Sequence, residues 1–364
     1  MVDLHGQYLK IKNEIDEAIQ NVIDSTTFIN GPQVKQLNVG LADYLECNHA
    51  ISCANGTDAL QIALMALDLQ PGDEVIIPDF TFTATAEVTA LLRLKPVFID
   101  VTPDSFVMDI EKFKKAITKR TKAVIPVHLY GQCADMEQIM DIAVKNGIFV
   151  IEDNAQAFGA DIKINDSWKK AGTVGHIGCT SFFPSKNLGC YGDGGALFTN
   201  DDKLASSIAC IANHGAKIKY HNDRIGVNSR LDTIQAAVLL IKLKKINEYI
   251  NSRQKAAKFY DTLFQDNDKI NTPVRVDYST HVFHQYTIVV DKRDELQKYL
   301  ALKNIPTQIY YPVGMHNQIA YKASGDFEVS DYLCKSVISL PMHTELSESQ
   351  QECIVNSINE FYKK

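Results

Sequence analysis

Residues 181–189 read SFFPSKNLG and set Lys186 among small and polar side chains. Upstream, residues 150–156 read VIEDNAQ, an apolar run that leads into Glu152 and Asp153. A lysine amine can form a Schiff base with an aldehyde cofactor, and a carboxylate at a strand end can hold a pyridinium nitrogen. A lysine in a glycine-rich loop is, taken alone, more often a solvated surface residue. The two segments together indicate pyridoxal phosphate (PLP) chemistry.

Length and charge narrow the class of protein. The chain has 364 residues, 45% of them hydrophobic, and a formal net charge of -7. This is enough for two domains and a full core. Phosphate contacts to nucleic acid need clustered Lys and Arg, so we expect no nucleic-acid partner. A small anionic ligand needs only a local cluster of donors and is still possible.

Cysteine usage and hydropathy predict the compartment. The eight cysteines form no Cys-x-x-Cys pair, so we expect reduced thiols in a cytoplasmic protein, and no metal site. The first residues, MVDLH, lack the basic start and the apolar run of a signal peptide. No apolar stretch reaches the roughly 18 residues of a membrane span, so we expect no membrane partner.

Short apolar runs alternate with helical patterns through the first two-thirds of the chain. The runs are residues 49–53, 74–78, 96–100, 123–127 and 149–151, followed by strand patterns at 177–183 and 194–199. This alternation is typical of a mostly parallel sheet covered by helices on both faces. Ligands of such sheets lie beyond the carboxyl ends of the strands, where Asp153 and residues 55–57 fall.

Helical spacing and the last third complete the predicted fold. Helices are expected over residues 8–24 and 231–250, the second with a continuation through Phe264. Two more are expected between them, one that starts at Pro32 and one that follows residues 55–58 and runs to about Leu67. The last third predicts a strand at 284–290, a helix from Asp294, a strand near Ile309 and two terminal helices. We therefore predict an α/β fold with a large domain, residues 1–245, and a smaller α+β domain, residues 246–364.

Several residues near the expected strand ends suit a phosphorylated aromatic ligand. Asn55-Gly56-Thr57 opens a helix, whose free N–H groups suit phosphate, although Thr57 could equally be a helix cap. Ser181 could add a hydroxyl, or be an ordinary strand-end serine.

The ring of the ligand has candidate partners as well. Asp153 needs a partner if it is buried, and a pyridinium nitrogen would serve. Gln156 could reach the phenolic oxygen of the same ring. Phe82 is a candidate for stacking on the ring face, although core packing is the commoner role of a phenylalanine.

The glycines of residues 189–195, GCYGDGG, superficially resemble a dinucleotide-binding loop. They precede a strand pattern rather than opening a helix, which disfavours a nicotinamide oxidoreductase. We interpret them as the tight turn that returns the lysine loop to the sheet.

Five motifs together resemble a known family. They are ANGTDAL at residues 54–60, EDNAQ at 152–156, SFFPSK at 181–186, GDGG at 192–195 and NSRLD at 228–232. In this order they are similar to the DegT/StrS family of PLP-dependent sugar aminotransferases, from about Asp3 to Pro341. The resemblance implies the aspartate aminotransferase fold, PLP fold type I. It also implies a homodimer with active sites at the subunit interface.

The resemblance also implies roles, residue by residue. Lys186 would be the Schiff-base lysine, and its presence favours transamination over the dehydration seen in relatives with histidine there. Asp153 would pair with the pyridine nitrogen and Gln156 with the ring hydroxyl. The remaining implied cofactor contacts are stacking by Phe82, phosphate binding by Gly56, Thr57 and Ser181, and a contact from Asn228 to the phosphate in the neighbouring subunit.

The substrate follows from a narrower similarity. SCANGT at residues 52–57, LYGQCAD at 129–135 and KNLGCYGD at 186–193 are similar to one branch of the family. That branch aminates C3 of UDP-2-acetamido-2-deoxy-3-oxo-glucuronate for surface polysaccharides, with L-glutamate as the expected donor. The alternative substrate is a dTDP-linked 3-keto-6-deoxyhexose.

Two features bear on the sugar. Tyr310-Tyr311-Pro312 stands where relatives often have His-Tyr-Pro, in a loop that touches the sugar in those relatives, so Tyr310 and Tyr311 are candidate substrate contacts. Arg230 could bind a carboxylate of glutamate or of a uronate, or form a salt bridge at the start of its helix.

Two further alternatives remain at this point. One is a non-catalytic protein of this fold that binds a nucleotide sugar. The other is a different PLP enzyme, such as a cysteine desulfurase, for which no nucleophilic cysteine is evident.

Overall fold

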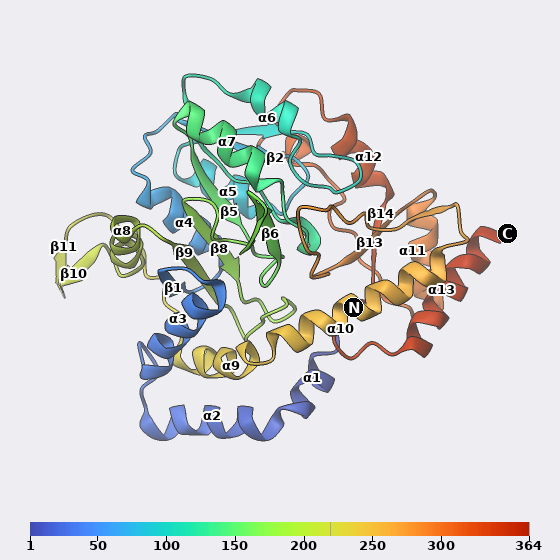
Figure 1. Ribbon diagram of the computed structural model, residues 1–364, viewed down its shortest axis with the longest axis horizontal. Coiled ribbons are helices and arrows are strands. Elements are labelled where there is room, and N and C mark those ends of the chain that lie inside the picture. Colours follow the sequence, from blue (N-terminus) through green and yellow to red (C-terminus); the bar gives the residue numbers. More distant parts are fainter. Residues whose placement is uncertain (219, 364) are drawn as a thin grey trace.

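A central sheet of seven strands organises the computed structural model, which describes residues 1–218 and 220–363 (Figure 1). The strands are β1 (His49–Cys53), β2 (Glu74–Pro78), β3 (Lys95–Ile99), β4 (Thr121–Val124), β5 (Phe149–Asp153), β8 (Ile177–Ser181) and β9 (Gly195–Thr199), in the order β1-β9-β8-β5-β4-β2-β3. β9 pairs antiparallel with β1 and β8, and every other neighbouring pair is parallel. The predicted α/β class with a mostly parallel sheet is therefore confirmed.

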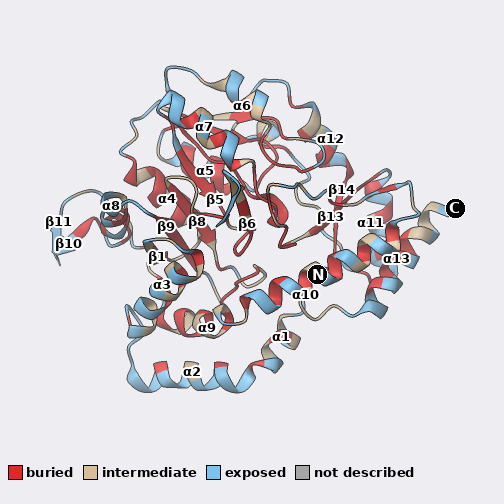
Figure 2. Cartoon of the chain, in the orientation of Figure 1, coloured by how far each residue is buried: buried red, intermediate tan, exposed pale blue. Residues whose placement is uncertain are grey.

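Helices cover both faces of this sheet because the strands are apolar on both sides. Alternate residues of β2 enter two different cores: Ile76 one, and Val75 and Ile77 the other. The first face is covered by α3 (Pro32–Leu45), α6 (Ile110–Ala116), α7 (Met136–Asn146) and α9 (Thr233–Leu243). The second is covered by α4 (Gly56–Ala66), α5 (Ala84–Leu91) and α8 (Asp202–Ala212). Figure 2 shows the strands as the buried interior between these layers.

The C-terminal part has a core of its own. It contains β12 (Ile270–Asn271), β13 (Tyr286–Val290), β14 (Val337–Leu340), α11 (Arg293–Leu302), α12 (Glu328–Ser336) and α13 (Glu348–Lys363). Helix α10 (Ile246–Phe264) joins the two parts, since Ile250 packs in the first core of the sheet and Tyr260 in the C-terminal core. The domain boundary between residues 245 and 246 remains a prediction.

The N-terminus packs against the sheet-covering helices. α1 (Leu4–Lys10) and α2 (Lys12–Ser25) are separate helices, because Ile11 leaves the helical region at φ -123 and ψ 17. Ile11 and Ile15 pack on Val238 of α9. The prediction of one continuous helix over residues 8–24 was therefore wrong.

Other differences from the sequence-based expectation are local. The helix predicted over 231–250 ends at Leu243 and α10 begins at Ile246. No strand forms at Ile309 in the described residues; Gln308 makes one bridge to Ser339, whose strand β14 was not predicted. Two hairpins were also missed, β6 (Asp161–Ile164) with β7 (Ser167–Lys170), and β10 (Ala216–Ile218) with β11 (His221–Asn222).

Two short 3-10 helices, η1 (Leu129–Gly131) and η2 (Met315–Asn317), complete the elements. Within the described ranges no helix is both long enough and apolar enough to span a bilayer. The eight cysteines are free, and six of them are buried.

Gly195 offers a test of how tightly α4 is held against the sheet. A Cβ there would lie 2.5 Å from the carbonyl carbon and oxygen of Asn55, the residue that caps α4. Gly195→Ala must displace this backbone, so we predict a loss of about 1–3 kcal/mol in the free energy of unfolding, measured by urea denaturation.

Gly40→Ala is the matched control. A Cβ at Gly40, inside α3, would meet only Leu243 at 3.4 Å, and alanine is the better helix former. This variant should be neutral or stabilised. Equal losses in both variants would contradict the packing described for Gly195.

Candidate functional site

A cavity of ≈ 700 Å³ opens at the carboxyl ends of the parallel strands. Its walls come from the segments that follow β1, β2, β4, β5 and β8, and from two C-terminal segments at residues 284–285 and 310–311. Nine of the predicted site residues line it: Gly56, Thr57, Phe82, Asp153, Gln156, Ser181, Lys186, Tyr310 and Tyr311. Segments far apart in sequence thus converge where a doubly covered sheet is expected to bind its ligand.

The N-terminus of α4 forms one end of the cavity. Asn55 caps the helix, since its side-chain oxygen accepts from the Asp58 N–H at 2.8 Å; Thr57 is the second helical residue and not the cap. A Cβ at Gly56 would lie 2.7 Å from Cβ of Ser181, so glycine lets the end of β8 meet the helix N-terminus. The N–H groups of Gly56 and Thr57 have no partner within the helix. They face a position suited to an anion.

Lys186 lies on the turn between β8 and β9 and is half-buried at the cavity wall. Its backbone N–H donates to the carbonyl of Phe183 at 2.8 Å, which fixes the turn. Burial lowers the pKa of the Lys186 amine to about 8, while the attraction of Asp153 opposes this shift. A much larger fraction of this amine than of an ordinary lysine is therefore unprotonated near neutral pH, as a nucleophilic lysine requires.

Asp153 ends β5 and is 7% exposed. Burial raises the pKa of its carboxyl group; a hydrogen bond from the Ala155 N–H, at 3.1 Å, and the charge of Lys186 act in the opposite direction. Among the described residues the Ala155 N–H is the sole hydrogen-bond donor to this carboxylate. One of its oxygens is therefore left for a ligand, and a cationic ring nitrogen would offset the cost of burial.

A fully buried pair, Glu152 and His128, supports Asp153. Glu152 accepts from the N–H groups of Gly172, Val174 and Gly175 at 2.6–2.8 Å. It lies 2.9 Å from Nε2 of His128, whose Nδ1 accepts from a backbone N–H.

The other bonds of His128 define its role. Because Nδ1 accepts, Nε2 carries the proton and donates to Glu152. The His128 backbone N–H also donates to the Asp153 carbonyl at 3.0 Å. The pair therefore holds the end of β5 in place.

Gln156 has a fixed orientation. Its Oε1 accepts from the backbone N–H of Tyr130 at 2.8 Å, so its Nε2 must be the group that points to the hydroxyl of Tyr311, 3.1 Å away. The second N–H of this amide is available to a ligand oxygen. Phe82 is 53% exposed at the cavity, with its ring centroid 6.2 Å from that of Tyr311. An exposed aromatic face at a cavity suits stacking better than core packing.

Asn228 and Arg230 are the two predicted residues that do not line the cavity. Asn228 is exposed and pairs through its backbone with Asn213. Among residues 1–218 and 220–363, no carboxylate lies within ion-pair distance of Arg230. The salt bridge considered for Arg230 is thus not formed in this part of the chain.

His284 and Gln285 line the cavity and were not predicted. Burial, together with the charges of Lys186 and Arg253, holds the pKa of His284 well below its usual range. Its Nδ1 is buried without a hydrogen-bond partner in the described residues. Both residues stand at the start of a predicted strand and reach the cavity from the C-terminal part. No local sequence pattern therefore indicates that they belong to the site.

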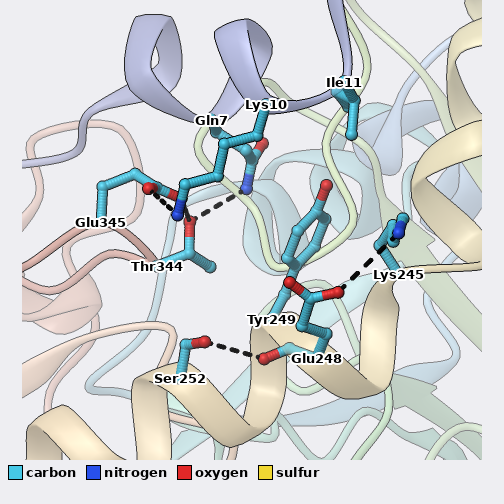
Figure 3. A pocket seen from close by; sticks show the side chains of 9 residues that line it. All are labelled: Gln7, Lys10, Ile11, Lys245, Glu248, Tyr249, Ser252, Thr344 and Glu345. Carbon is cyan, nitrogen blue, oxygen red and sulfur yellow. Dashed lines mark hydrogen bonds and ion pairs between the residues drawn. The ribbon is translucent and has the colours of Figure 1, made fainter. Parts of the chain in front are cut away.

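A second, smaller cavity of ≈ 100 Å³ lies between α1, α10 and the loop at Thr344 (Figure 3). Its charged side chains pair off, Lys10 with Glu345 and Lys245 with Glu248. It therefore presents no unmatched charge, and the larger cavity is the candidate active site.

Comparison with known proteins agrees with this geometry. A family model described as the DegT/DnrJ/EryC1/StrS aminotransferase family matches residues 9–359. The chain belongs to this family of aminotransferases. Its fold is accordingly the one shared by PLP-dependent aminotransferases.

Three relatives illustrate the similarity of this aminotransferase. The UDP-2-acetamido-2-deoxy-3-oxo-D-glucuronate aminotransferase of Pseudomonas aeruginosa is 48% identical over 354 residues, covering 97% of each chain. A UDP-N-acetyl-3-dehydro-alpha-D-glucosamine 3-aminotransferase of Acidithiobacillus ferrooxidans is 43% identical, covering 96% of this chain and 94% of the relative. The structure of NtdA from Bacillus subtilis with bound cofactor PMP has a TM-score of 0.90 at 30% identity, covering 98% of this chain and 82% of that one.

The attraction between Asp153 and Lys186 gives a pH-dependent prediction. An amine attacks an aldehyde only when it is unprotonated, so the rate of PLP attachment to the cofactor-free protein should rise through pH 8. Asp153→Asn removes a charge that stabilises the ammonium form. The midpoint of the rate–pH profile, measured by stopped-flow absorbance, should therefore move to lower pH.

Asp58→Asn is the control, since Asp58 lines the same cavity and is not among the groups that shift the pKa of Lys186. Its midpoint should match the wild type. An unchanged or raised midpoint in Asp153→Asn would contradict the electrostatic coupling.

Proposed function

We propose that this aminotransferase binds PLP and moves an amino group from L-glutamate to a UDP-linked 3-oxo-sugar, with C3 of UDP-2-acetamido-2-deoxy-3-oxo-glucuronate as the preferred acceptor. The observation that carries the proposal is the meeting of a lysine with a lowered pKa and a buried carboxylate in one cavity at the strand ends. The similarity to the relative from P. aeruginosa supports the choice of sugar.

The residues present fit the cofactor. The cradle between Gly56 and Ser181 has no room for a Cβ at Gly56, and it offers open N–H groups of a helix N-terminus to a phosphate. Asp153 would pair with the ring nitrogen and Lys186 would hold the aldehyde carbon covalently. The other holding residues would be Thr57, Gln156 and Phe82, as argued above from their positions in the cavity.

The chemistry divides between cofactor and chain. Bound PLP supplies an electron sink for the bonds at the amino-bearing carbon. With the cofactor bound, the Lys186 amine would accept the proton from the donor Cα as general base and would return a proton as general acid. A pKa of about 8 suits both tasks near neutral pH. Asp153 would pair with the ring nitrogen of the bound cofactor and favour its cationic form.

The proposal also covers the residues that contact the sugar and the assembly of two subunits. Tyr310 and Tyr311 line the cavity and would contact the sugar. Asn228 and Arg230 lie outside the cavity of their own chain, and in a homodimer with shared sites they would serve the neighbouring one. Arg230 would then be available to the carboxylate of the uronate.

The enzyme would act in the cytoplasm, and its product would enter a surface polysaccharide such as O-antigen or capsule.

A second acceptor is favoured by the relative from A. ferrooxidans, which is named for a UDP-linked 3-dehydro-glucosamine. It differs from the uronate in lacking the carboxylate. A dTDP-linked 3-keto-6-deoxyhexose is the third acceptor to compare.

Steady-state kinetics with the three acceptors and L-glutamate test the proposal. We expect the highest kcat/KM for the uronate. Arg230→Met should lower that value by about 10-fold to 100-fold, as for loss of a hydrogen bond between charged groups, and should leave the glucosamine derivative unaffected.

Lys186→Ala serves as the inactive control, and Lys203→Ala, at an exposed position on α8, as the active one. A loss of kcat/KM for L-glutamate, with the values for all three acceptors unchanged, would instead assign Arg230 to glutamate. A preference for the dTDP sugar would refute the proposed acceptor, and turnover by Lys186→Ala would refute the proposed chemistry.

A further inference from the structure

Lys242 is a buried cation that the proposed chemistry does not use. It lies on α9, its side chain is 1% exposed, and it does not line the large cavity. Its Nζ donates to the carbonyl oxygen of Gly189 at 2.6 Å and stands 5.0 Å from the ring centroid of Tyr191. In the part of the chain that the structure describes, no carboxylate is paired with it.

Gly189 belongs to the turn that carries Lys186. The turn is closed at its base by the Cys190 N–H, which donates to the Phe182 carbonyl at 2.8 Å. Its two limbs touch, because a Cβ at Gly189 would overlap the carbonyl oxygen of Pro184. These contacts restrict the backbone of the turn. We therefore expect that a displacement of the Gly189 carbonyl also moves Lys186.

Helix α9 holds the same segment at a second point. Gln235 accepts from the Tyr191 N–H at 2.8 Å and donates to the Tyr191 carbonyl at 3.3 Å. Gln235 and Lys242 are seven residues apart and therefore share one face of the helix. This face of α9 contacts the turn through two polar side chains, although apolar side chains would be sufficient for packing alone.

Burial of a charge without a carboxylate partner is costly, and an apolar side chain of similar shape is often at least as stable. Burial indeed lowers the pKa of the Lys242 amine to about 8. A buried lysine with a shifted pKa beside a functional turn is a candidate for a functional role.

We propose that Lys242 is a positioning residue, whose hydrogen bond to the Gly189 carbonyl fixes the turn and thereby places the Lys186 amine in the cavity. It acts through the turn and touches neither cofactor nor substrate. The inference rests on the proposed function of Lys186 as the lysine that holds PLP.

The test compares Lys242→Met, which keeps the length of the side chain and removes the donor, with Lys242→Arg, which keeps a donor and a charge. Lys244→Met, at an exposed position two residues away, is the matched control. Each protein is loaded with PLP, reduced with borohydride and digested, and the modified peptide is identified by mass. The readouts are the melting temperature, the pH titration of the visible absorption band, and kcat and KM for L-glutamate.

We expect Lys242→Met to melt no lower than wild type and still to carry PLP on Lys186. Its absorbance–pH midpoint should shift and its kcat should fall on the order of 100-fold, the scale of a misplaced reacting group, with a smaller change in KM. Lys242→Arg should recover most of kcat. A midpoint and kcat equal to those of Lys244→Met would overturn the proposal.

Two outcomes keep the inference separate from the proposed function. Absence of PLP on Lys186 in the wild-type peptide would refute the function itself. If Lys242→Met is insoluble, Lys242→Gln replaces it, as an uncharged side chain with a weaker donor. An intermediate loss of kcat is then expected, and wild-type kcat and titration would again overturn the role of Lys242.

Discussion

The electrostatic attraction between Lys186 and Asp153 is the interaction on which the rest of the site depends. Burial acts against both charges, lowering the pKa of the amine and raising that of the carboxyl group. Each partially offsets the cost of the other, and a ligand with a cationic ring nitrogen would relieve the carboxylate further. The Lys186 amine, with a pKa of about 8, can therefore change its protonation state close to neutral pH, which is the condition that proton transfer by a lysine requires.

The sheet makes this attraction possible. Parallel pairing of β5 with β8 sets Asp153 opposite Cys179, two residues before the Ser181 that meets the N-terminus of α4. Outside the cavity, buried polar groups hold these strand ends: Glu152 and His128 behind Asp153, and Lys242 behind the lysine turn. Several buried polar groups thus support the strand ends around one cavity, where positional accuracy matters for catalysis.

The central sheet and most of the site could be predicted from local sequence, for physical reasons. Buried strands read as apolar runs, and residues at their carboxyl ends converge by topology, so Asp153 and Gly56 were found. Features that depend on contacts between distant segments could not be predicted from local sequence. His284 enters the cavity from the C-terminal part, and the role proposed for Lys242 depends on its hydrogen bond to Gly189, 53 residues away in sequence. The break between α9 and α10 was likewise invisible, because both helices are apolar at helical spacing.

The most direct measurement is the visible absorbance spectrum of the PLP-loaded protein before and after addition of L-glutamate. The account predicts that the band of the lysine-bound cofactor disappears and that the band of its amino form grows in without any sugar present. A band that persists in glutamate would contradict the proposed donor reaction, and a protein that shows no lysine-bound band at all would contradict the role assigned to Lys186.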